Sequence, residues 1–181
     1  MELVQQKKRL RQEMKEIMGF VTDTSERSVQ LLENVLKAKL LKKGQLVSVF
    51  VPMEDEVDTI PLVEYCWENG ISVSVPEFQS QRQDPFILRN WERSDHLYET
   101  QYGIFHPRNS KTFTLEEVDL VFVPGMAFTK KGVRLGRGKG FYDHMLSQYD
   151  GKKVGLCFQE QIKENIPFDE RDVLVDVVIA C

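Results

Sequence analysis

The stretch LVSVFV, residues 46–51, is a short continuous apolar run bounded by Gly44 and Pro52. Such a run is typical of a strand that is buried on both faces of a parallel sheet. Four further runs share this character: ISVSV (71–75), LVFVP (120–124), VGLCF (154–158) and VLVDVVIA (173–180). These runs predict the strands on which the fold is built.

Helical patterns alternate with these strands. Residues 2–18 repeat apolar side chains at helical spacing, and a second helix is expected behind a cap at Thr24 and Ser25. The expected helices cover residues 2–18, about 26–41, 59–68, 139–149 and 161–165. Strand and helix in alternation favour right-handed crossovers. We therefore expect an α/β fold, a three-layer αβα arrangement with a mainly parallel sheet covered on both faces, as a single domain over residues 1–181.

The middle of the chain, residues 77–118, lacks this clear alternation. FQSQRQDPF (78–86) is typical of a loop, FILRNW (86–91) of a strand and TLEEV (114–118) of a helical turn.

Composition excludes several classes of protein. With 41% hydrophobic and 29% charged residues among 181, the chain is neither disordered nor a coiled coil. No apolar run approaches the ~20 residues that span a bilayer. Charges crowd the first 15 residues, where a signal peptide needs an apolar core, and the three cysteines form no CxxC pair. We expect a cytoplasmic protein, and a monomer.

The charges are distributed unevenly. Residues 120–142 contain no acid and five cations, so this segment carries +5 while the whole chain carries −4, and the remainder carries −9. The acidic remainder argues against a nucleic-acid or membrane partner. The cationic segment begins at the carboxyl end of a predicted strand, where ligands bind in α/β sheets. An anionic ligand is expected there.

Within that segment, RLGRGKG (134–140) places three glycines at alternate positions between cations. Glycines let backbone N–H groups approach a phosphate, and Arg and Lys add charge. Asp143 follows, and a carboxylate beside a polyphosphate is a natural Mg²⁺ ligand. The spacing matches neither the Walker pattern nor the dinucleotide fingerprint. By itself it leaves a phosphate loop and a flexible basic turn both open.

The longer stretch PGMAFTKKGVRLGRGKGFYD (124–143) resembles the signature of the 5-formyltetrahydrofolate cyclo-ligase family, also called methenyltetrahydrofolate synthetase. The resemblance extends along the chain through Lys7-x-x-x-Arg11, MEDEVDT (53–59), YGIFHP (102–107) and IPFDERDVLVDVVI (166–179). It implies conversion of 5-formyltetrahydrofolate into 5,10-methenyltetrahydrofolate, with hydrolysis of MgATP to ADP and phosphate. In the family's mechanism the formyl oxygen attacks the γ-phosphate, and N10 then closes on the activated carbon. The partner would be a small-molecule folate.

The resemblance also implies roles for individual residues. ATP would be bound by Lys7, Lys8, Arg9, Leu10, Arg11, Arg134, Leu135, Gly136, Arg137, Gly138, Lys139, Gly140, Phe141 and Tyr142, with Arg137 and Lys139 catalytic. The folate would be bound by Val51, Glu56, Tyr102 and Phe141, and Mg²⁺ by Asp143 and Asp172. One assignment has separate support, because Lys7 and Arg11 share one face of the predicted first helix.

Alternatives remain at this point. Asp143 is also an ordinary acid for the first turn of a helix, Asp172 is also a partner for Arg171, and Tyr102 is also a core tyrosine. A folate or nucleotide binder without turnover would keep the same loop. A sugar-phosphate isomerase would need an acid–base pair, and residues 120–142 contain no acid or His.

Overall fold

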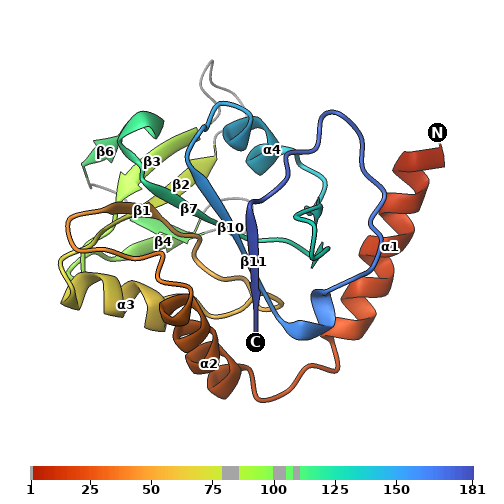
Figure 1. Ribbon diagram of the computed structural model, residues 1–181, viewed down its shortest axis with the longest axis horizontal. Helices are drawn as coiled ribbons and strands as arrows, with labels where there is room; N and C mark the ends of the chain where they lie inside the picture. The colour runs from red at the N-terminus through yellow and green to blue at the C-terminus, as the bar shows by residue number, and fades with distance from the viewer. Residues whose placement is uncertain (1, 79–85, 100–104, 108–110) are drawn as a thin grey trace.

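The centre of the molecule is one twisted sheet (Figure 1). The computed structural model describes residues 2–78, 86–99, 105–107 and 111–181. Within these residues the sheet has seven strands in the order β11-β10-β7-β1-β2-β3-β6. They are β11 (Val177–Ala180), β10 (Lys152–Cys157), β7 (Leu120–Val123), β1 (Leu46–Ser48), β2 (Ser72–Phe78), β3 (Phe86–Asn90) and β6 (Thr112–Phe113). The first five run parallel, whereas β3 is antiparallel to both β2 and β6.

Helices cover both faces of this sheet. The described helices are α1 (Glu2–Met18), α2 (Thr24–Lys37), α3 (Ile60–Glu68) and α4 (Phe141–Leu146), with 3-10 turns η1 (Leu115–Glu117) and η2 (Gln159–Gln161). In Figure 1, α2 and α3 lie below the sheet, α4 lies above it and α1 stands at one side. Two short hairpins complete the structure, β4 (Leu97–Glu99) with β5 (Phe105–Pro107) and β8 (Ala127–Phe128) with β9 (Arg134–Leu135).

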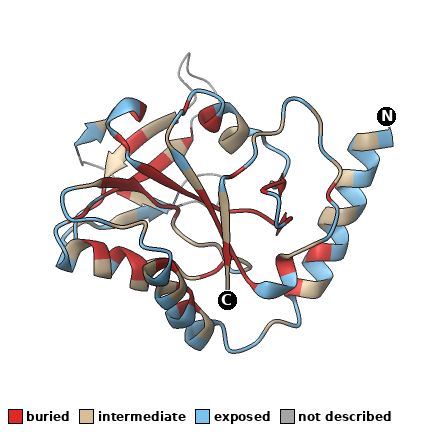
Figure 2. Cartoon of the chain, viewed as in Figure 1, coloured by how far each residue is buried: buried red, intermediate tan, exposed pale blue. Residues whose placement is uncertain are grey.

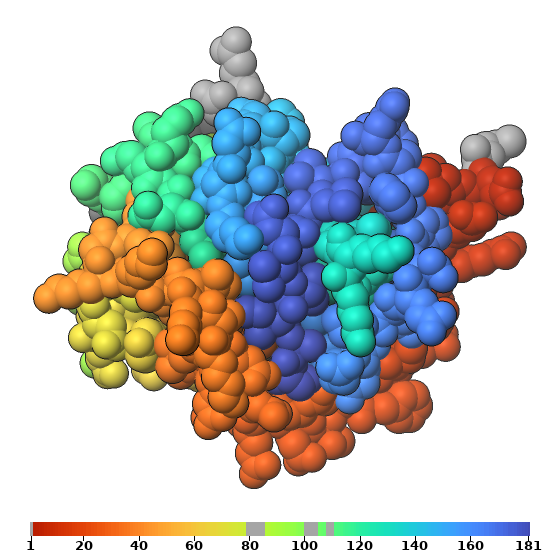
Figure 3. Space-filling model, in the orientation of Figure 1, coloured from red at the N-terminus to blue at the C-terminus, as the bar shows by residue number. Residues whose placement is uncertain are grey.

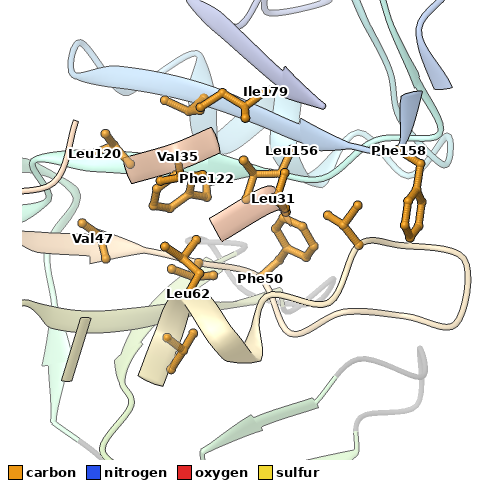
Figure 4. Packing of buried hydrophobic residues seen from close by; sticks show 14 of the residues in the cluster. Leu31, Val35, Val47, Phe50, Leu62, Leu120, Phe122, Leu156, Phe158 and Ile179 are labelled. Atoms are coloured by element: carbon orange, nitrogen blue, oxygen red, sulfur yellow. The ribbon is translucent and has the colours of Figure 1, made fainter. Parts of the chain in front are cut away.

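Alternation along the central strands builds a core on each side. In β7, Leu120 and Phe122 join the apolar cluster under α1, α2 and α3, whereas Val121 and Val123 join the cluster under α4. Side chains two residues apart point to the same face of a strand, so an apolar run fills both cores. Figure 4 shows part of the first cluster. Figure 2 shows that the central strands are largely buried, while the helices are exposed on their outer sides.

This architecture confirms the predicted α/β fold, but several elements are shorter than predicted. The second helix ends at Lys37 rather than near residue 41, because Lys39 adopts a φ of 55°. The fourth begins at Phe141 rather than at 139, because its N-cap Gly140 has a φ of 71°. Conversely, β2 runs on to Phe78 because it pairs with β3 over its whole second half.

Near the C-terminus one prediction is wrong and another is confirmed only in its second half. The predicted helix over 161–165 is absent from the described chain, where Ile162 instead bridges Phe128 as a short extended pair. The predicted strand over 173–180 begins only at Val177, since Val175 donates its N–H to Gly132 of the β8–β9 hairpin (2.9 Å). The hairpin thus contacts Ile162 and Val175, whereas Val177–Ala180 pair with β10 in the sheet.

No helix in the described part of the chain is long and apolar enough to cross a membrane.

The order of the strands marks a place for a ligand. From β1 the chain crosses through α3 to β2 on one side, whereas β7, β10 and β11 lie on the other side of β1. Crossovers that leave in opposite directions open a crevice at the carboxyl ends of the two strands. Here that crevice lies beyond β1 and β7.

Candidate active site

A cavity of about 250 Å³ lies beyond the carboxyl ends of β1, β2 and β7. Its walls come from α1, from residues 50–56 after β1, from the end of β2, from Pro124 and Gly125 after β7, from residues 134–143, and from Asp172. Segments that are far apart in the sequence therefore meet here. In the space-filling view the red N-terminal helix lies against the blue C-terminal third of the chain (Figure 3).

The β8–β9 hairpin folds the cationic segment back toward β7. Thr129 donates its N–H to Val133 (2.8 Å), and its hydroxyl accepts the Val133 N–H (3.1 Å), which closes the turn. The pairing sets Arg134 opposite Phe128. This return carries the glycine loop to the mouth of the crevice, where the sequence predicted an anionic ligand.

The glycine loop that follows the hairpin, residues 136–140, has left-handed backbone angles at two of its glycines. Gly138 has a φ of 96° and Gly140 a φ of 71°, both in the left-handed region that favours glycine. A Cβ at Gly138 would lie 3.3 Å from the guanidinium carbon of Arg11. Arg11 itself donates from Nε to the carbonyl of Gly136 (2.8 Å). The first helix is thus attached to the loop at Gly136, and Arg11 also lies close to Gly138.

Arg134 lies beneath the loop rather than on it. Its side chain is buried, donating to Asp143 Oδ1 (2.8 Å) and to the carbonyl of Pro124 (3.3 Å). Its Nε is buried without a hydrogen-bond partner in the described structure. The guanidinium also lies 5.7 Å from the ring of Tyr142. Arg134 lines the cavity, but its charge is already shared with Asp143.

Arg137 reaches across the cavity to the loop after β1. It forms ion pairs with Asp55 and with Glu56 (3.1 Å). Burial opposes the charge on its guanidinium, but the hydrogen bond to Asp55 and the two carboxylate charges outweigh burial and raise its pKa. Burial raises the pKa of Glu56, with Arg137 opposing that shift. The pair therefore joins opposite walls of the cavity.

Two lysines at the cavity differ in their surroundings. Lys7 of α1 forms an ion pair with Asp172 (2.7 Å), and both side chains are mostly buried. Lys139 is exposed and, among the described residues, forms no hydrogen bond or ion pair. Its charge is therefore available to a ligand.

The two predicted metal ligands lie close together. Asp143 Oδ1 accepts a hydrogen bond from the backbone N–H of Val173, the residue after Asp172 (3.3 Å). Burial lowers the pKa of Arg11, and the charges of Asp172 and Asp143 both oppose this shift, so both carboxylates face the same cation. The described residues contain no group of three or more His, Cys, Asp or Glu side chains that would hold a metal alone. Two carboxylates fit Mg²⁺ only where phosphate oxygens or water complete its coordination.

Aromatic rings form another wall. The Phe78 and Phe141 rings stack with centroids 5.0 Å apart and planes 7° apart, and Tyr142 lies 5.1 Å from Phe78. Phe50 and Val51 also line the cavity, next to Glu56. A flat heteroaromatic ring bearing hydrogen-bond donors suits such a wall, with the carboxylate as acceptor.

The structure brings most of the predicted site residues together, but not all of them. Lys7 and Arg11 line the cavity, whereas Lys8 and Arg9 are exposed and Leu10 packs against the core. Lys7 and Arg11 are four residues apart and so share one face of α1, whereas Lys8 and Arg9 point away from that face. Tyr102 lies outside the described residues.

Sequence reasoning missed Phe78, Asp55 and Gly125. Phe78 ends β2, so the rule that ligands bind at carboxyl ends of strands would have found it had the strand been drawn to its full length. A Cβ at Gly125 would lie 2.7 Å from the Phe128 ring, a contact that only the folded chain reveals.

Comparisons with known proteins identify one family, and the similarity extends over nearly the whole chain. The model of the 5-formyltetrahydrofolate cyclo-ligase family matches residues 3–181. The 5-formyltetrahydrofolate cyclo-ligase of Mus musculus is 32% identical over 187 residues, covering 96% of this chain and 92% of its own. A probable 5-formyltetrahydrofolate cyclo-ligase of Caenorhabditis elegans is 32% identical over 188 residues, covering 96% and 91%.

Solved structures show the same fold. The 5,10-methenyltetrahydrofolate synthetase of Aquifex aeolicus superposes with a TM-score of 0.82 at 29% identity, covering 96% of this chain and 89% of that one. A 5,10-methenyltetrahydrofolate synthetase from Mycoplasma pneumoniae gives a TM-score of 0.72 at 23% identity, covering 99% and 98%.

Proposed function

This chain belongs to the 5-formyltetrahydrofolate cyclo-ligase family, and on that premise we propose that its cavity converts 5-formyltetrahydrofolate into 5,10-methenyltetrahydrofolate at the expense of ATP. The observation that carries the proposal is the meeting, in one cavity, of a cationic glycine loop with an aromatic wall beside a buried glutamate. The first suits a polyphosphate and the second suits a pteridine ring.

The triphosphate would lie along the glycine loop. Backbone N–H groups near Gly138 and Gly140 would approach the phosphate oxygens, and Lys139 and Arg11 would add positive charge. Asp143 and Asp172 fit Mg²⁺ as two carboxylates beside phosphate oxygens. Mg²⁺, when bound, would neutralise charge on the phosphates; Arg134 and Lys7 balance these carboxylates in the structure.

The folate would place its pteridine against Phe78 and Phe141. Glu56 would then accept hydrogen bonds from the amino group and ring N–H of the pteridine. Burial raises the pKa of Glu56, and the neighbouring Arg137 opposes this shift and favours the ionised acceptor. Both ligands would thus reach the cavity from different walls.

The reaction would take place between the bound ATP and the bound folate. The formyl oxygen would attack the γ-phosphorus, the bond between that phosphorus and the β–γ bridging oxygen would break, and ADP would leave. N10 would next attack the activated formyl carbon and lose its proton, and phosphate would depart with the formyl oxygen. Arg137 and Lys139 would stabilise charge on the transferring phosphoryl group, and the two bound ligands would fill the cavity and keep water from competing.

One assay tests this proposal directly. Mixing the protein with MgATP and 5-formyltetrahydrofolate should produce the absorbance of 5,10-methenyltetrahydrofolate, together with ADP and phosphate in equal amounts. Leaving out ATP should abolish the signal. Binding of 5-formyltetrahydrofolate without any product would contradict the proposed activity and identify a folate binder instead.

A further inference from the structure

The guanidinium of Arg137 is held along one edge. Its Nε and Nη2 both donate to Glu56 Oε1, at 3.2 and 3.1 Å, and Nη2 also donates to Asp55 Oδ1. No described residue accepts a hydrogen bond from Nη1. The bound edge therefore orients the group, and the Nη1 end keeps its donors for a ligand.

The two carboxylates that hold this edge are not equivalent. Glu56 Oε2 accepts the N–H of Met53 (3.1 Å), so the backbone of its own loop fixes Glu56. The proposed folate contacts also fall on Glu56. Asp55 has no such task in the proposed function, and its ion pair with Arg137 spans 82 residues of sequence.

We infer that Asp55 is a positioning residue, which holds Arg137 on the loop after β1 so that its Nη1 end faces the phosphoryl group being transferred. This inference rests on the proposed function of Arg137. An arginine has many rotamers, and fixing one of them only during the reaction would cost side-chain entropy. An anchor that is already formed in the folded protein removes that cost, in the way that supporting contacts orient catalytic groups elsewhere.

Asp55 keeps this role when the folate binds. Donors from the pteridine would compete with Arg137 for the oxygens of Glu56. Asp55 would then be the remaining carboxylate on Arg137, and its hydrogen bond from Nη2 is already formed before the folate binds. Asp55, in the loop after β1, therefore anchors Arg137 whether or not the folate is bound.

The variant Asp55→Asn tests the inference, with Glu54→Gln as its matched control. Glu54 is exposed in the same loop, so its variant removes the same charge one residue away. We expect Asp55→Asn to lower kcat about tenfold or more while the KM for 5-formyltetrahydrofolate stays within about twofold. Glu54→Gln should leave both unchanged. Equal kinetics for the two variants would overturn the inference.

A double-mutant cycle separates positioning from a general structural effect. In an Arg137→Ala background, Asp55→Asn should lower kcat no further, because the group that it orients is gone. If Asp55→Asn reduced kcat by the same factor with and without Arg137, Asp55 would act through something else and the inference would fail.

A measurement without turnover tests the geometry itself. In ¹⁵N-labelled protein with 5-formyltetrahydrofolate bound and ATP left out, the pteridine would engage Glu56, which otherwise accepts from Nε and Nη2 of Arg137. The heteronuclear NOE of the Arg137 Nε–Hε group should then show an ordered side chain in the wild type and in Glu54→Gln, and a mobile one in Asp55→Asn. An ordered Arg137 in Asp55→Asn would overturn the inference even in an active enzyme. A wild type with ordered Arg137 and no product would contradict the proposed function instead, and with it the catalytic part of this inference.

Discussion

Lys139 differs from the other cations around the cavity because its charge has no partner among the described residues. Lys7 is paired with Asp172, Arg134 with Asp143, and Arg137 with two carboxylates. A phosphate that binds near these side chains must share them with carboxylates. Arg11 forms no ion pair, but its Nε already donates to the carbonyl of Gly136. Among the described cations of the cavity, Lys139 alone keeps all its donors available to a phosphate, which makes it the strongest candidate for contact with the transferring phosphoryl group.

Replacing Lys139 with alanine should therefore affect the chemistry more than folate binding. We expect kcat to fall about 10²- to 10³-fold, as when one charge-stabilising group is removed from an active site. The folate Kd, measured by fluorescence titration, should stay within about twofold. Lys130→Ala is the control, since Lys130 is an exposed cation of the same segment outside the cavity. Equal rates for the two variants would place the phosphoryl group elsewhere.

Glu56 should make stability depend on pH in a predictable direction. Burial raises its pKa above the ordinary value near 4.5, so the folded protein keeps this proton where the unfolded chain has lost it. Its contribution to stability is full below the ordinary pKa and is lost as pH rises through the raised pKa. Urea unfolding should therefore show the wild type losing stability relative to Glu56→Gln across that window. Parallel pH profiles would contradict the raised pKa.

At the scale of elements, the β8–β9 hairpin decides where the cationic segment lies. The sequence of residues 125–136 shows glycines and lysines but no strand pattern, because β8 and β9 are only two residues long each. The hairpin depends on Thr129, which closes the turn with both backbone and hydroxyl, and on Val175, which donates to Gly132. These contacts link residues that no local pattern relates.

Gly138 should be sensitive in a way that tests the glycine loop. Alanine at a φ of 96° costs roughly 1–2 kcal/mol of backbone strain, and its Cβ would also press on Arg11. We expect the KM for ATP to rise in Gly138→Ala. Gly44→Ala is the matched control, since Gly44 has a φ of 86° and open space around a Cβ, but lies outside the cavity. Both variants should lose similar stability in urea, and a raised KM for ATP in both would remove the case for a local effect.

At the scale of the whole molecule, the sheet supports the site from beneath. The same β7 strand that packs Phe122 into one core and Val121 into the other leads directly to Pro124 and Gly125 at the cavity. Phe122 is fully buried. The packing of Phe122 therefore stabilises the sheet against its helices and also positions Pro124 and Gly125 at the cavity.

Truncating Phe122 to alanine should lower the free energy of unfolding by about 3–5 kcal/mol, because it removes a buried ring and leaves a cavity in a close-packed core. Val29→Ala is the control, since Val29 is 53% exposed on α2 and should change stability by about 0.5 kcal/mol or less. Urea denaturation followed by circular dichroism measures both. A loss below about 1 kcal/mol for Phe122→Ala would show that the core repacks around the missing ring.

The sequence predicted those features that depend only on the residues within a short segment, such as strands and local charge. The apolar runs at 120–123 and 154–157 are strands because alternate side chains fill two cores, and that pattern is visible without a structure. The charge imbalance and the glycines at 136, 138 and 140 marked the segment for an anion. Element ends were less predictable, because residues such as Lys39 adopt backbone angles that their type rarely favours.

The sequence by itself determined the α/β class, the five parallel strands of the sheet, and which segment carries the concentrated positive charge, because these follow from periodicity and composition. Only the tertiary structure decided which charges are free. Arg134 and Lys139 stand five residues apart in one motif, yet the hairpin buries the first against Asp143 and leaves the second exposed. Asp55 likewise meets Arg137 only because the ends of β1 and β7 lie side by side. Pairing depends on distance in space, and the chain must fold before those distances exist.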